Sequence, residues 1–285
     1  MALTLVDVAV DWAPDPGALL LAGVSASLYT AGVRRLARRG RAWPAVRSVA
    51  FGGAVVALVV ATCSGLATHE SDSFTVHAGQ HALLAMVAPL LLALSAPLTL
   101  ALQATHRPAQ VALLRLLDSG PVAVVSHPVV VWAAWGATLV ALYTTSLYDL
   151  SLRNEWLHAT VHGHMLVVGG LFCWTAVGLD PGRHRLPDAA RVLFVLLAVP
   201  FHAVVGLSLL GTPGRAAGVS IIWTTGELFG LMATAIVVAR WMQVEERAAA
   251  RAERSVVTRA QAWAWDADED GTSRTQVAGQ QRGNP

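Results

Sequence analysis

Seven apolar segments, each about as long as a membrane-spanning helix, dominate the sequence. They run roughly over residues 17–36, 48–67, 76–102, 123–145, 155–178, 190–210 and 218–241. The hydrocarbon core of a bilayer is about 30 Å thick, and ~20 residues of helix are needed to cross it. None of the segments alternates apolar and polar residues as a half-buried strand does. The sequence therefore predicts an all-α fold, a polytopic membrane helical bundle with about seven transmembrane helices.

The composition supports a lipid environment and excludes several classes of function. The chain is 55% hydrophobic and 13% charged, whereas an ordinary soluble domain carries about 25% charged residues. The sequence has no glycine-rich phosphate loop, no nucleotide fingerprint and no Ser-His-Asp arrangement. We expect the lipid bilayer to surround the chain, and nothing in the sequence favours a nucleic-acid partner.

The distribution of arginine predicts the orientation in the membrane. Eighteen of the 20 basic residues fall in the first, third and fifth connections and in the C-terminal tail. Because basic residues concentrate on the cytoplasmic side, we expect the N-terminus outside and the C-terminus in the cytoplasm. Residues 1–242 would form the transmembrane domain. Residues 243–285 would form a cytoplasmic tail, first a helical extension and then, from about Asp266, a disordered polar segment.

Two pairs of histidines lie inside apolar segments, near the end predicted to face outward. His77 and His81 open the third segment, and His158 and His162 belong to the fifth. Residues four apart share one face of a helix, and ~1.5 Å per residue places His81 and His162 roughly 8–10 Å below the outer boundary. Ionisable groups inside a membrane are costly and usually functional. Imidazole binds copper, zinc, iron or nickel, so the spacing predicts a metal site.

Further polar groups are expected at a similar depth. His202 and Glu227 lie at about 12 Å by the same helical rise, where they could form the floor of the site. His164 points away from His162, and His69 and Cys63 lie at the rim; each could be an additional ligand or a support, or could simply pack. Met86 and Met165 lie one turn or less deeper than the pairs. They could supply sulfur for Cu(I), or they could fill gaps in the core.

An ordered series of motifs gives the chain a family resemblance from about Leu19 to Arg254. The series runs VHAGQHALLAMVAPLLLALSAPLTLAL, SHPVVVWAAW, LHATVHGHMLVVGGLFCWTAVGLDP, VPFHAVVGLSLLG and GVSIIWTTGELFGL. With these motifs the sequence resembles the CtaG-like cytochrome c oxidase assembly factors, which are polytopic bacterial membrane proteins. The positions that match the family pattern are His77, Gln80, His81, His158, His162, His164, His202, Trp223 and Glu227.

The resemblance implies a function without turnover chemistry. The family is implicated in placing copper at the copper B centre of the oxidase. A member would act as a chaperone in the bacterial cell membrane, with the catalytic subunit of cytochrome c oxidase and an extracytoplasmic copper donor as partners. The family often has Met where this chain has Ala78, Ala82 and Val161. These departures remove thioethers but leave an imidazole site intact, and we expect His77, His81, His158 and His162 to bind copper.

Two other functions use similar histidine patterns. A membrane di-iron oxygenase or desaturase also carries several H-x-x-x-H clusters, usually with more histidines and on the cytoplasmic side. A haem b electron carrier would use two histidines, one from the third segment and one from the fifth. Two irons per chain would favour the oxygenase, and a Soret band would favour the haem protein.

Overall fold

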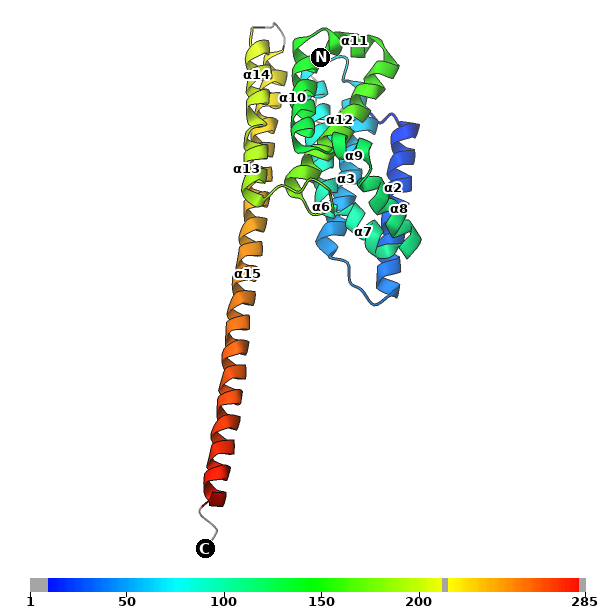
Figure 1. Cartoon of the computed structure of the whole chain (residues 1–285). Helices are drawn as coiled ribbons and strands as arrows, with labels where there is room; N and C mark the ends of the chain where they lie inside the picture. Colours follow the sequence, from blue (N-terminus) through cyan, green and yellow to red (C-terminus); the bar gives the residue numbers. More distant parts are fainter. Residues whose placement is uncertain (1–9, 212–214, 282–285) are drawn as a thin grey trace. The chain divides into compact units, whose positions relative to one another are not determined.

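The computed structural model describes residues 10–211 and 215–281, with side chains as far as residue 257. Throughout these ranges every regular element is a helix and no strand occurs, as Figure 1 shows. The prediction of an all-α fold is therefore confirmed.

Six helical stretches are long and apolar enough to cross a membrane. They are Pro16–Arg38 (α2), Ala45–Thr68 (α3 and α4), Phe74–Ala104 (α5 to α7), Glu155–Val177 (α12), Asp188–Leu209 (α13 and α14) and Ala216–Val257, the first part of α15. A seventh span arises if α10 (Pro128–Thr144) and α11 (Leu147–Arg153), which meet at a bend of 74°, are taken together. This agrees with the expected number of about seven.

Several of these spans are built from shorter elements. Their bounds are α3 Ala45–Cys63, α4 Gly65–Thr68, α5 Phe74–Ala82, the π-helix η1 Leu83–Val87, α6 Ala88–Ser95, α7 Pro97–Ala104, α13 Asp188–Leu196 and α14 Val199–Leu209. Two short helices, α8 (Arg107–Leu117) and α9 (Gly120–Val125), connect α7 to α10.

The chain separates into two compact units, residues 1–237 and 238–285. Helix α15 runs from Ala216 to Gln281 and supplies the described part of the second unit. Its helical course includes Asp266–Gln281, which we expected to be disordered. A helix that has already begun adds further residues without a new nucleation step. Residues 282–285 lie outside the described part, and the cytoplasmic position of the tail stays a prediction.

Helix α12 occupies the centre of the first unit. It packs against η1, α6, α10, α11 and α13, while α3 packs against α6. The side chain of Asn154 accepts a hydrogen bond from the Leu157 amide and so caps the N-terminus of α12. Gly178, in the left-handed conformation with φ 58°, caps its C-terminus. The core around this helix includes Phe172, which is fully buried and stacks on Trp135.

Two contacts hold the third span in place. Gly169 of α12 lies directly over the Ala85 carbonyl of η1, where a β-carbon would be only 2.2 Å from the oxygen. Farther along, the span breaks at Ala96, which has φ 50°. The buried carboxylate of Asp180 accepts hydrogen bonds from the Leu98 and Thr99 amides and from the Thr99 hydroxyl, and thereby caps the start of α7.

Candidate metal centre

The four histidines of the two H-x-x-x-H pairs meet in one place. Within α5 the rings of His77 and His81 have centroids 3.9 Å apart, and within α12 those of His158 and His162 are 4.1 Å apart. Across the two helices, His77 lies 5.7 Å from His158 and His81 lies 5.2 Å from His162. The geometric part of the sequence prediction, that the pairs converge, is thus confirmed. We call these four residues the histidine cluster.

The histidine cluster is sheltered, and most of its buried nitrogens lack hydrogen bonds. His77 and His81 are 0% and 3% exposed. Within the described part of the chain, no hydrogen-bond partner is found for either ring nitrogen of His77, for Nδ1 of His158, or for Nε2 of His81 and His162. A buried polar atom without a partner is costly. A bound metal ion, which takes the lone pair of a neutral imidazole, would remove that cost.

A carboxylate from the connection between α4 and α5 closes one side of the histidine cluster. Glu70 Oε1 lies 2.9 Å from His158 Nε2, and Glu70 Oε2 lies 3.9 Å from His162 Nε2. One ligand atom from each of these three residues can be chosen so that all lie within 4.8 Å of one another. Ligand atoms about 2.0–2.2 Å from one ion lie at most about 4.4 Å apart, so the three residues could share a metal ion after they move slightly closer together.

Tyrosines from the bent pair α10 and α11 contact the two histidines of α5. The Tyr143 hydroxyl lies 3.0 Å from His81 Nδ1, and the Tyr148 ring meets the His77 ring edge-on at 4.8 Å. If His81 Nδ1 carries the proton and donates it to Tyr143, then Nε2 is left as a ligand. Gln80, also buried, donates from Nε2 to the Ala61 carbonyl and ties α5 to α3.

Three of the additional predicted residues have hydrogen-bond partners outside the histidine cluster. His164 is exposed, and its Nε2 lies 2.9 Å from the Thr138 hydroxyl of α10. Glu227 is exposed as well and accepts a hydrogen bond from the indole of Trp223, one turn earlier in α15. Cys63 is buried at the end of α3, where its sulfur accepts a hydrogen bond from the Asp15 amide.

His202 is buried against another part of the bundle. It is 2% exposed, and Gly226 of α15 lies so close that a β-carbon would be 2.3 Å from the imidazole. Its nearest described aromatic neighbour is Trp135, at 6.3 Å between ring centroids. The backbone of Ala198, one turn earlier in the chain, faces the His202 imidazole. His202 packs against Gly226 and Glu227 pairs with Trp223, so their expected role as the floor of the site stays a prediction.

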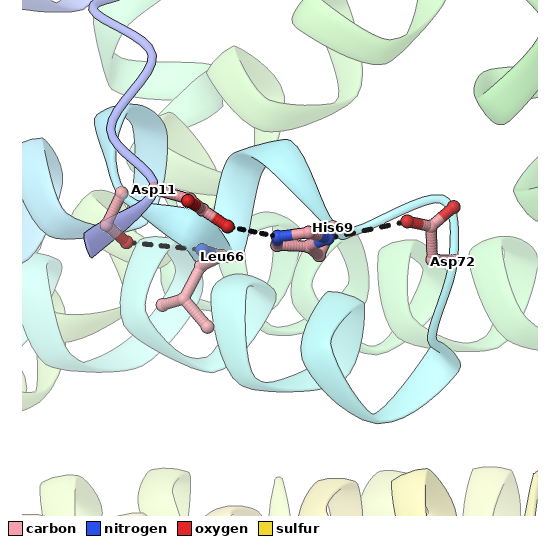
Figure 2. Close-up of polar contacts among 5 residues, drawn as sticks. Asp11, Leu66, His69 and Asp72 are labelled. Carbon is pink, nitrogen blue, oxygen red and sulfur yellow. Dashed lines mark hydrogen bonds and ion pairs between the residues drawn. The ribbon is translucent and has the colours of Figure 1, made fainter. Parts of the chain in front are cut away.

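His69 joins the N-terminal segment to the connection that carries Glu70. Figure 2 shows its ring between two carboxylates, with Nε2 2.9 Å from Asp11 and Nδ1 3.4 Å from Asp72. The hydrogen bond to Asp11 raises the pKa of His69 above its ordinary value, and Asp72 acts in the same direction. His69 therefore anchors the connection that carries Glu70, and a role as an additional ligand stays a prediction.

Sequence reasoning missed three residues that border the histidine cluster: Glu70, Tyr143 and Tyr148. Each was visible as a polar or aromatic residue at the end of an apolar segment, on the side where the histidines were expected. That position is a usable signal, but it does not show which helix lies next to which. A multi-helix membrane protein with four histidines gathered between its helices belongs to a class in which such groups usually mark a functional site.

Comparison with known proteins narrows this class to one family. The family described as "Cytochrome c oxidase caa3 assembly factor" matches residues 27–244, and the chain belongs to it. The chain is also similar to uncharacterized protein Mb0105 of Mycobacterium bovis and MT0111 of Mycobacterium tuberculosis, each 33% identical over 79% of this chain. ML1998 of Mycobacterium leprae is 34% identical over the same share. The chain spans 38% of the length of these relatives. No solved structure matches it.

Proposed function

We propose that this chain binds copper at the histidine cluster and assists the insertion of copper into cytochrome c oxidase. The observation that carries the proposal is the convergence of His77, His81, His158 and His162, with unpaired nitrogens, in a member of an oxidase assembly family. Imidazoles with one nearby carboxylate suit copper. Copper is the cargo here and is passed on without being chemically changed by this chain.

The partners and the location follow from the same proposal. The receiving protein is the catalytic subunit of the oxidase, at its copper B centre, and the supplier is an extracytoplasmic copper donor. The chain would act in the bacterial cell membrane with its N-terminus and the histidine cluster on the outer side. The arginine distribution supports this orientation. In this orientation the histidine cluster would be within reach of a donor outside the cell.

Metal analysis of the purified protein tests the proposal. Wild-type protein should retain copper, and the double variant His81→Ala with His162→Ala should lose most of it. The matched control is His164→Ala, which removes a histidine of the same helix that faces α10 and should leave the copper content unchanged.

Oxidase activity in membranes provides the second readout. It should fall in the double variant and stay normal in the His164→Ala control, with equal amounts of inserted protein. Normal oxidase activity in the double variant would contradict the assembly role. A Soret band or two irons per chain in the wild-type protein would instead support the haem or di-iron alternative.

A further inference from the structure

A small cavity lies against His81, inside the first unit of the chain. Its volume is about 20 Å³, and its lining includes His81, Tyr143, Thr225, Met86 and Met165, with apolar side chains completing it. A void needs roughly 10–15 Å³ to hold one water molecule. This cavity therefore has room for a single small species, such as one water molecule or one metal ion.

Both thioethers of the cavity come from the segments that carry the histidine cluster. Met86 lies in η1, after His81, and Met165 lies in α12, after His162. They are 5% and 2% exposed, whereas Met232 and Met242 are 46% and 59% exposed. The two buried methionines thus both line the cavity, and they approach it from two different segments.

The π-helix explains how Met86 reaches this position. In an α-helix with 3.6 residues per turn, side chains five positions apart point about 140° away from each other. A π-helix closes its hydrogen bonds between residues five apart, so residues at that spacing come nearly into line. His81 and Met86 are five residues apart. The π-helical turn Leu83–Val87 begins two residues after His81 and contains Met86. Short π-helical turns are frequent at functional sites.

The chemistry of the lining differs from that of the histidine cluster. The cluster has the carboxylate of Glu70 beside it. The cavity has neutral groups only, namely thioethers, an imidazole and two hydroxyls. Thioethers select Cu(I). The cost of burying an ion without a counter-charge rises with the square of its charge, which disfavours a divalent ion here.

We propose that this cavity is a second metal position, for one soft monovalent ion of the Cu(I) class, held by Met86, Met165 and His81. His81 belongs to both positions because it contacts the other cluster histidines and also lines the cavity. An ion that has reached the histidine cluster can therefore move to the thioethers by exchanging ligands around His81. The ion stays Cu(I) throughout, so no oxidant or reductant is needed. This inference deepens the proposed function and rests on it only for the source of the ion.

The test uses the full-length protein in detergent, loaded anaerobically with Cu(I) or with Ag(I). X-ray absorption at the copper edge of the wild-type protein should show sulfur as well as nitrogen ligands. In the double variant Met86→Leu with Met165→Leu the sulfur contribution should disappear, and Ag(I) affinity should fall at least tenfold. Leu is close to Met in volume, so the packing is largely kept. The control is Met232→Leu, at an exposed site, which should behave as the wild type.

The possible results separate this inference from the proposed function. Absence of sulfur ligands in the wild type, or Ag(I) binding unchanged in the double variant, would overturn the cavity site. The wild-type spectrum decides this even if the double variant does not fold. Cu(II) binding reports on the histidine cluster alone and should persist in the double variant. If the sulfur-dependent Ag(I) site is present while oxidase activity stays normal in the variant His81→Ala with His162→Ala, the proposed function fails and the cavity site stands.

Discussion

Replacing Gly169 by alanine should weaken metal binding although the residue lies two turns from His162. A β-carbon at Gly169 would lie 2.2 Å from the Ala85 carbonyl oxygen, and ordinary contact begins at 3.4 Å. The obstructing atom is backbone and cannot rotate away, so α12 must move away from η1 by about 1.2 Å. Small residues at such positions allow membrane helices to approach closely.

The expected loss of copper affinity follows from how far the displacement separates the two histidine pairs. Overpacking costs about 1–3 kcal/mol, and the better helix propensity of alanine returns up to about 1 kcal/mol. Metal–ligand distances tolerate changes of only about 0.2 Å. Because η1 follows His77 and His81 directly while α12 carries His158 and His162, the displacement pulls the two pairs apart. We expect copper affinity to fall about tenfold to a hundredfold, with every ligand still present.

Two glycines of the same helix provide matched controls. A β-carbon at Gly163 or Gly170 would meet no atom within 4 Å, apart from its own helix and immediate neighbours. Gly163→Ala and Gly170→Ala should therefore keep wild-type copper affinity and raise the unfolding temperature in detergent slightly. Copper titration and thermal unfolding of the three variants make the comparison. If Gly169→Ala behaves like the two controls, the close approach of α12 and η1 does not set the geometry of the cluster.

Three further substitutions or conditions test other contacts. Glu70→Gln removes the charge beside the cluster at constant shape and should weaken Cu(II) binding about tenfold in a titration, whereas Asp72→Asn should leave it unchanged. Asp180→Ala leaves the start of α7 without its cap and should lower the free energy of unfolding by about 1–3 kcal/mol, with copper content retained; an unchanged unfolding midpoint would disprove the capping role. The raised pKa of His69 means that its ion pair with Asp11 is complete below the ordinary value and is lost as the pH rises through the folded pKa. Amide hydrogen exchange of the N-terminal segment, corrected for the intrinsic pH dependence, should therefore show less protection at high pH, and Asp11→Asn should abolish this change.

Much of the architecture could be predicted from the residues because membrane burial leaves few choices. A long apolar stretch in lipid must satisfy its own backbone, so it becomes a helix. Five of the seven predicted segments agree with the observed spans within a few residues, whereas the fourth span is displaced and the last continues to Val257. The pairing of His77 with His81, and of His158 with His162, is a local consequence of helical spacing. These features depend only on residues that are close to one another in the sequence.

Other features depend on which helices lie next to each other, and only the tertiary structure decided them. Glu70 closes the histidine cluster because the connection before α5 passes over α12. Glu227 was expected at the floor of the site from its depth along the helix alone, yet it is exposed and accepts a hydrogen bond from Trp223 because of the rotation of α15 about its axis. The rotation of each helix about its axis, and the helices that it packs against, are set by packing between distant segments, such as Gly169 against Ala85. The spacing of residues along the sequence carries no information about this packing.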